Sequence, residues 1–181
     1  MAPAGGFTLL EVLVALTLLT GALLALAQLM LVAARASDAS KATTLATALA
    51  AQRIEQLRAL AWAMAPDGTA VEDVECEVAR WPDAPTGGVG LTPSPADALL
   101  ENTPGYVDYL DASGRWIGDG RSPPAFATYL QRWSIEAPEG SSPATLVLRV
   151  VVWRRGVPSR LQAESWLPIV QIDAAKTWRG E

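Results

Sequence analysis

The acidic residue Glu11 lies at the front of the longest apolar stretch of the sequence. It ends the segment GFTLLE of residues 6–11, and the next charged residue along the chain is Arg35. A helix over residues 12–34 would rise about 35 Å, which is enough to cross a hydrocarbon core of about 30 Å. A carboxylate inside a bilayer costs roughly 2.5–3.5 kcal/mol on insertion scales. Glu11 is therefore expected either to lie among lipid headgroups or to form an ion pair with a cation supplied from elsewhere.

Residues suited to catalysis or metal binding are scarce. The sequence has no histidine, which removes Ser-His-Asp triads, Cys-His pairs, His-ligated metals and imidazole acid–base chemistry. Its single cysteine, Cys76, cannot form an intrachain disulfide and is expected to be a small buried side chain. Asp108, Asp111 and Asp119 lie near glycines, but the EF-hand calcium pattern is absent, so a solvated turn is the favoured interpretation. The sequence predicts no enzyme, no metal site and no cofactor.

The charge of the chain argues against direct nucleic-acid binding. The formal net charge is −5, from 14 basic and 19 acidic residues, and nothing in the pattern forms a broad basic surface. A local group of arginines is expected to flank exposed strands and to keep the edges of a sheet soluble. These residues are Arg149, Arg154, Arg155 and Arg160.

One long helix is the main element that the sequence predicts. No proline occurs between Pro3 and Pro66, and the residues between them are rich in alanine and leucine, which are strong helix formers. The helix is expected to run from Phe7 to about Met64. Beyond residue 34 it becomes amphipathic, with one apolar stripe at steps of three and four and with Arg53 off that stripe. The stripe comprises Ala46, Leu49, Ala50, Ile54, Leu57, Ala61 and Met64.

The residues that follow the helix show shorter periods. Residues 74–78 alternate in polarity as a half-buried strand does, although the same residues also fit a helix. A loop rich in proline and glycine is expected over 82–104, and residues 106–120 predict a hairpin that turns at 111–114.

The last third of the chain predicts a three-stranded antiparallel meander, with strands in 126–136, 145–153 and 161–170. Such a meander is wide enough to cover the apolar stripe of the helix, so the predicted fold class is α+β, with a long N-terminal helix packed on a small antiparallel sheet. The residues expected to share a face within each strand are Tyr129, Gln131, Trp133 and Ile135; Leu146, Leu148, Val150 and Val152; and Leu161, Ala163, Ser165 and Leu167.

The N-terminal segment resembles the start of a known family. The residues GFTLLE followed by the apolar run to Ala34 are similar to the N-terminus of type IV prepilins and of type II secretion pseudopilins. The resemblance implies that residues 1–6 are a leader, and that a prepilin peptidase cleaves between Gly6 and Phe7 and methylates the new amino group of Phe7. It also implies that Glu11 acts in filament assembly.

The resemblance also implies a pilin-like organisation of the rest of the chain. Residues 7–34 would be the transmembrane and assembly helix, 35–65 its amphipathic continuation, and 66–181 a globular periplasmic domain with an antiparallel sheet. A cytoplasmic N-terminus follows from the resemblance alone, because the basic residues between 35 and 53 would favour the opposite orientation by the positive-inside rule.

Within this family the segments 6–29, 45–60 and 129–136 look most like PilV-type minor pilins. The resemblance implies a structural minor pilin of a type IV pilus, in a minor-pilin complex that primes assembly or lies at the tip. Its implied partners are the prepilin peptidase, other major and minor pilins, the inner-membrane assembly platform and the lipid bilayer. It would reside in the inner membrane as a single-pass protein and then in the pilus at the cell surface. Two alternatives remain: a type II secretion minor pseudopilin of the I type and, in another class, a single-pass anchored periplasmic binding module.

The resemblance supplies a cation for Glu11. Cleavage after Gly6 would create an ammonium group on Phe7, and methylation would keep it charged. Two unit charges about 4 Å apart gain up to ~4 kcal/mol at an effective dielectric constant near 20, which is comparable with the insertion cost of the carboxylate. Glu11 of an incoming subunit would then meet the Phe7 amine of a neighbour. In the competing interpretation Glu11 lies in the headgroups, where a carboxylate in the first helical turn favours the helix dipole.

Overall fold

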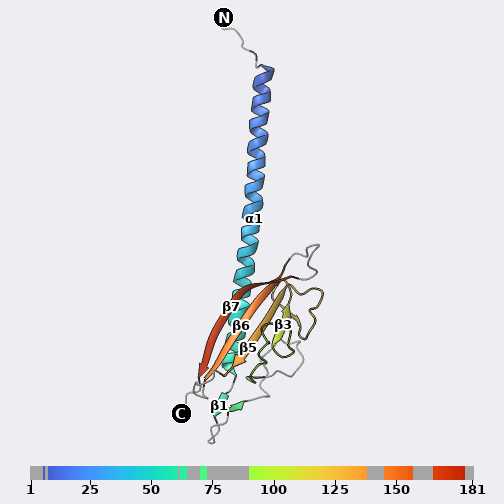
Figure 1. Cartoon of the computed structure of the whole chain (residues 1–181). Helices are drawn as coiled ribbons and strands as arrows, with labels where there is room; N and C mark the ends of the chain where they lie inside the picture. The colour runs from blue at the N-terminus through green and yellow to red at the C-terminus, as the bar shows by residue number, and fades with distance from the viewer. Residues whose placement is uncertain are drawn as a thin grey trace. The chain divides into compact units, whose positions relative to one another are not determined.

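The chain divides into two compact units, Met1–Lys41 and Ala42–Glu181. The first unit holds the front of a long helix, and the second holds the rest of that helix together with two antiparallel sheets (Figure 1). The predicted combination of one long N-terminal helix and an antiparallel sheet is confirmed. The structure, a computed structural model, describes residues 6, 8–60, 62–64, 70–72, 90–137, 145–156 and 165–177.

Helix α1 runs without interruption from Leu9 to Ala59. Its high content of alanine and leucine gives it strong intrinsic helix propensity over this length. The expectation that it continues to Met64 is wrong, because Trp62–Met64 forms strand β1, which pairs antiparallel with β2, Ala70–Glu72. The helix therefore ends about one turn before the point that the apolar periodicity suggests.

A lysine from the end of the chain explains where α1 stops. The Nζ atom of Lys176 donates hydrogen bonds to the backbone carbonyls of Leu57, Arg58 (2.6 Å) and Leu60. These are the carbonyls that the N–H groups of a further helical turn would use, so the ammonium group satisfies the helix end in their place. A tertiary contact thus overrides the helix propensity of the residues that follow.

Five strands form the larger sheet: β3 (Val107–Leu110), β4 (Trp116–Gly118), β5 (Tyr129–Glu136), β6 (Thr145–Arg155) and β7 (Trp166–Thr177). All neighbouring pairs are antiparallel, and the spatial order is β4-β3-β5-β6-β7. Figure 1 shows the last four of these side by side, from β3 to β7. The predicted hairpin and the predicted meander are both confirmed. The structure adds that the hairpin joins the meander by pairing β3 with β5.

The last strand lies further along the chain than the sequence suggests. Its described part runs from Trp166 to Thr177, seven residues beyond the predicted end at 170, and Leu167 is 57% exposed. The strand continues to Thr177 because its pairing with β6 extends across Asp173 and two alanines. Aspartate and alanine have little strand propensity of their own. The β7 residues that contact the core are Ile169, Val170, Ile172 and Ala174. Leu161, Ala163, Cys76 and the strand predicted over 74–78 lie outside the described residues.

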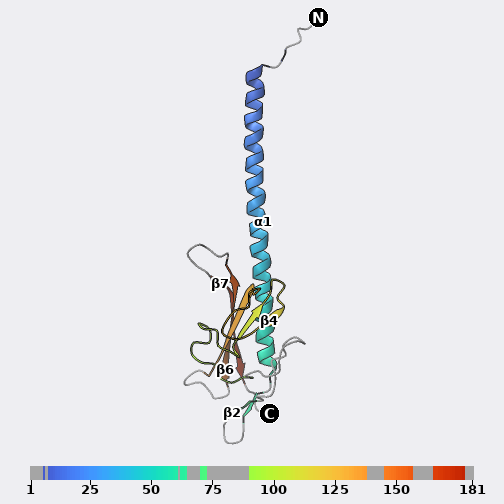
Figure 2. The same cartoon turned by 90° about the vertical axis from the view of Figure 1, so that its right-hand side faces the viewer.

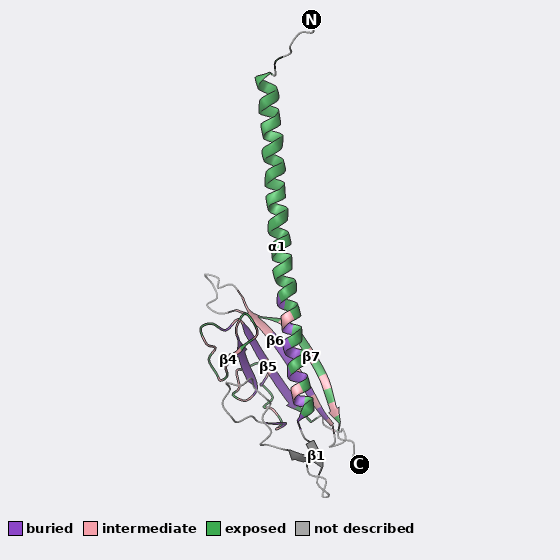
Figure 3. Cartoon of the chain, turned by 180° about the vertical axis from the view of Figure 1, so that it is seen from behind, coloured by how far each residue is buried: buried purple, intermediate pink, exposed green. Residues whose placement is uncertain are grey.

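The main core lies between the part of α1 that follows Lys41 and one face of the sheet (Figure 2). The residues expected to share a face on β5 and on β6 are all buried, so these two predicted faces are confirmed. The helix contributes part of the predicted stripe, and burial on α1 is confined to this part of the helix (Figure 3). The central members of the core are Ala46, Leu49, Ala50, Ile54 and Leu57 from the helix and Trp133, Ile135, Leu148, Val150 and Val152 from the sheet.

Candidate functional site

Thr8 caps the N-terminus of helix α1. Its carbonyl oxygen accepts hydrogen bonds from the backbone N–H groups of Glu11 (3.1 Å) and Val12 (3.3 Å), and its Oγ1 atom accepts from the N–H of Glu11 at 3.3 Å. Thr8 and Glu11 stand three residues apart, at the N-cap and N3 positions, which is the spacing of a capping box. Our sequence interpretation did not assign a role to Thr8, although this spacing is the signal that identifies it.

Of the two residues at the predicted cleavage point, the structure describes Gly6. Gly6 is exposed, and a Cβ atom added to it would meet no heavy atom within 4 Å. Its backbone is also not among those with positive φ, so the local structure does not require glycine at this position. Phe7 lies outside the described residues.

Glu11 is exposed in the first turn of α1 and has no cation near it on the described part of the helix. The next ionisable residue of α1 is Arg35, roughly 36 Å away along the helix axis at about 1.5 Å per residue. Its negative charge favours the positive end of the helix dipole, but a full counter-charge for Glu11 must come from outside the described part of α1.

The part of α1 before Lys41 is exposed along its length (Figure 3), and most of its exposed side chains are apolar. Its large apolar side chains are between 49% and 79% exposed, and the helix is long and apolar enough to cross a membrane. The hydroxyl groups of Thr17 and Thr20 donate to helix carbonyls at 2.8–3.0 Å, as polar groups in an apolar medium must. A surface of this kind fits lipid or other apolar helices far better than water. The exposed side chains are Leu9, Leu10, Val12, Leu13, Val14, Leu16, Leu18, Leu19, Leu23, Leu24, Leu26, Leu29, Met30, Leu31 and Val32.

A buried ion pair joins the part of α1 that follows Lys41 to the sheet. Arg53 and Asp108 are 6% and 0% exposed and bond directly through Nη2 and Oδ2. The other carboxylate oxygen of Asp108 accepts from the indole N–H of Trp116 at 3.0 Å, and the Arg53 guanidinium lies 4.3 Å from the ring centre of Trp133. The prediction that Arg53 lies off the buried stripe is therefore wrong, as is the prediction of a solvated turn at Asp108.

A further polar contact holds the same stretch of α1. Gln131, which is 3% exposed, donates from Nε2 to the backbone carbonyl of Leu49 at 3.0 Å. With the Lys176 contacts at the helix end, three sheet residues bind α1 through polar groups as well as through apolar packing. Burial lowers the pKa of the Lys176 amino group, and the nearby Arg58 charge lowers it further.

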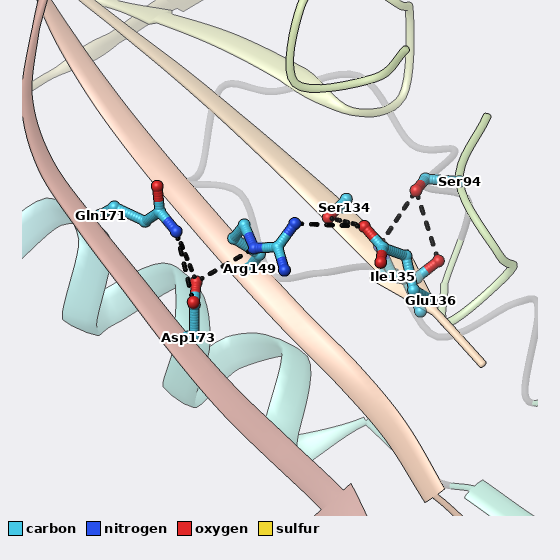
Figure 4. Close-up of polar contacts among 7 residues, drawn as sticks. All are labelled: Ser94, Ser134, Ile135, Glu136, Arg149, Gln171 and Asp173. Atoms are coloured by element: carbon cyan, nitrogen blue, oxygen red, sulfur yellow. Dashed lines mark hydrogen bonds and ion pairs between the residues drawn. The ribbon is translucent and has the colours of Figure 1, made fainter. Parts of the chain in front are cut away.

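The opposite face of the sheet carries a row of polar side chains that crosses three strands (Figure 4). Arg149 on β6 lies between Glu136 on β5 (3.5 Å) and Asp173 on β7 (3.3 Å). Ser134 donates to Glu136 at 2.9 Å, and Gln171 donates to Asp173 at 3.1 Å. Arg149 stands between the two carboxylates, so each negative charge in the row is paired with the same cation.

The remaining acidic candidates do not form a metal site. Among the described residues no three His, Cys, Asp or Glu side chains gather in a way that could hold a metal ion. Asp111 Oδ1 accepts from the Ser113 hydroxyl (2.7 Å) and from the backbone N–H groups of Ser113 and Arg115. The Ser113 hydroxyl contributes most to holding the pKa of Asp111 below its ordinary value. Asp111 thus shapes the turn between β3 and β4, as the sequence predicted, and Asp119 is exposed.

An open cavity of about 600 Å³ lies beside the segment that precedes β3. Arg132, one of its lining residues, donates to the carbonyls of Leu99 and Leu100 and to the side chain of Asn102. These bonds hold that segment against β5, so the arginine has a structural role there.

Comparison of the chain with known protein families, with curated proteins and with solved structures found no match.

Proposed function

We propose that this protein is a structural minor pilin. It is made as a prepilin with a leader over residues 1–6, is cut between Gly6 and Phe7 by a prepilin peptidase and is methylated on Phe7. It adopts a pilin-like fold, lies in the inner membrane with its sheet domain in the periplasm, and is then built into a type IV pilus through its apolar helix. It acts there with other minor pilins at the initiation of assembly or at the tip, and it has no catalytic activity.

The observation that carries this proposal is the setting of Glu11. A lone carboxylate lies in the first turn of an exposed apolar helix, and the described part of that helix offers no cation within roughly 36 Å. A helix that served only as a membrane anchor would gain from this carboxylate the helix-dipole interaction of about 0.3–1 kcal/mol, which is smaller than the roughly 2.5–3.5 kcal/mol cost of placing it in lipid.

Filament assembly gives the carboxylate a partner. An ion pair with the ammonium group on Phe7 of a neighbouring subunit would offset the similar cost of placing the Glu11 carboxylate in lipid. The pair can form at one axial position only. Glu11 thereby sets the register between subunits. The resemblance of residues 6–34 to prepilins is the second support, and it fits a type II secretion pseudopilin equally well.

The test compares two substitutions of Glu11 in cells that carry the peptidase and the assembly platform. Glu11→Val is expected to be processed normally but to be poorly recovered in sheared filaments, since it cannot pair with the ammonium group. Glu11→Asp keeps the charge and is expected to retain most of the recovery. Equal recovery of the valine variant and the parent protein contradicts the proposed role of Glu11.

The filament that is lost when the gene is deleted distinguishes a pilus from a type II secretion pseudopilus. An anchored periplasmic binding module, which needs neither processing nor Glu11, would leave both filaments intact.

A further inference from the structure

The two edges of the five-stranded sheet differ sharply in length. Strand β4 has 3 residues, whereas β7 has 12 and is paired along its length with β6 only, among the described residues. Short edge strands resist pairing with other chains, and long ones invite it unless they carry specific protection. The β7 edge is therefore the part of the sheet most open to an added strand.

Protection of β7 is confined to its two ends. Pro168 lies near the start, where the pairing register with β6 shifts, and Lys176 lies near the end with its Nζ atom bonded to helix carbonyls. Between them, residues 169–175 carry one charge, Asp173, which is already paired with Arg149 (Figure 4). From Val170 to Ala175 the strand pairs with β6 without a register shift and contains no proline, so Asp173 is its one protecting charge.

The side chains of this stretch alternate between the two faces of the sheet. Val170, Ile172 and Ala174 point towards the core and are only partly buried, so each still has apolar surface to cover. Gln171 and Asp173 lie on the opposite face and are exposed (Figure 4). An added strand would have to match an apolar row on one face and an amide next to a carboxylate on the other.

We propose that a second copy of this chain supplies that strand, with the two β7 strands antiparallel about a two-fold axis at Ile172. In this register Ile172 faces Ile172 of the second copy, and Val170 faces Ala174. The Gln171 amide faces the Asp173 carboxylate on the other side, and the two-fold axis repeats this pair. The inference does not depend on the proposed filament function.

Neighbouring registers fit less well. A shift of the axis to residue 173 places the two Asp173 carboxylates opposite each other, which is unfavourable. A shift to residue 171 brings Pro168 opposite Ala174, inside the paired stretch, where proline lacks the N–H group that a ladder needs. The register at Ile172 leaves Pro168 opposite Lys176, outside the pairing. The sequence of β7 is therefore self-complementary about this one residue.

Disulfide trapping of the full chain in detergent micelles tests the register. In a Cys76→Ser background, Ile172→Cys is expected to form a covalent dimer on mild oxidation, because facing residues of antiparallel strands lie about 4.5–5.5 Å apart, within the range that a disulfide spans. Val170→Cys and Ala174→Cys are matched controls on the same face. Each alone is expected to stay monomeric, since its copies would lie roughly 13 Å apart, whereas an equal mixture of the two should cross-link.

Dimer affinity provides a second measurement that needs no cysteine. Gln171→Asp opposes two carboxylate pairs and is expected to weaken the dimer about two- to thirty-fold, whereas Gln171→Lys should strengthen it. Thr177→Asp, which lies outside the paired stretch, is the control and should change little. Equal cross-linking of all three single cysteine variants, as helix-driven association would give, overturns the proposal. Absence of any cross-link at Ile172, as expected if another segment or another protein covers β7, overturns it as well.

Discussion

The buried ion pair between Arg53 and Asp108 gives the sharpest prediction about the stability of the fold. Asp108→Asn removes the negative charge but keeps an oxygen that accepts from the Trp116 indole N–H, which lies 3.0 Å from Oδ1. It leaves the guanidinium of Arg53, which is 6% exposed, without its counter-charge. Removal of one partner from a buried pair costs about 3–5 kcal/mol.

The expected magnitude lies near the lower end of that range. The Trp133 ring, 4.3 Å from the guanidinium carbon, still attracts the cation and retains about 1 kcal/mol of favourable interaction. We therefore expect the free energy of unfolding to fall by about 3 kcal/mol. For a unit of this size the midpoint of thermal unfolding should fall by roughly 6–12 °C.

The assay is thermal unfolding of the full chain in detergent micelles, followed by near-ultraviolet circular dichroism of the tryptophans. Arg53→Met should be similarly destabilising, because it leaves the Asp108 charge buried. The double variant, Arg53→Met with Asp108→Asn, removes both charges and should be more stable than either single variant. Small and additive effects, each below about 1 kcal/mol, would refute the view that this pair locks α1 to the sheet.

Three further predictions concern local contacts and use the same unfolding assay. Lys176→Met should lower the free energy of unfolding by about 1–2 kcal/mol through loss of the hydrogen bonds to the helix end. Burial puts the pKa of Lys176 in the folded state below its value in the unfolded state. The parent protein should therefore gain stability as pH rises through the interval just below 10.5, and the variant should lack this gain. Asp111→Ala should lower the free energy of unfolding by about 1 kcal/mol at neutral pH. Because the pKa of Asp111 is lowered in the folded state, the difference in stability from the parent should vanish as pH falls through that pKa. A difference that does not depend on pH would contradict the role of the Asp111 charge. Gly114→Ala should cost more than Gly120→Ala, because both glycines have positive φ but only the first would place Cβ within 3.2 Å of a helix side chain.

The helix and the central strands could be predicted from the sequence because their signals are local. The alternation of Trp133 and Ile135 on β5, and of Val150 and Val152 on β6, fixes which faces are buried before any partner is known. The same holds for the turn at Asp111, whose spacing to glycine is a local signal. Patterns of this kind predict the structure well because burial of one face of a strand requires apolar residues at alternate positions.

The contacts between distant segments could not be predicted in this way. Arg53 and Asp108 are 55 positions apart, and each alone has the appearance of a solvated charge. Lys176 ends α1 from more than a hundred residues away, so helix propensity alone placed that end too late. At the N-terminus the sequence predicts roles for Gly6 and Glu11, and these stay predictions, whereas the cap provided by Thr8 was identified from the structure.

The claim that Glu11 meets a newly formed terminal ammonium requires that such a terminus exists. The most direct test is the intact mass of the protein extracted from membranes of cells that contain the prepilin peptidase. Processing as proposed would give a chain that begins at Phe7 and carries one added methyl group. A chain that retains Met1 to Gly6 in those cells would contradict it.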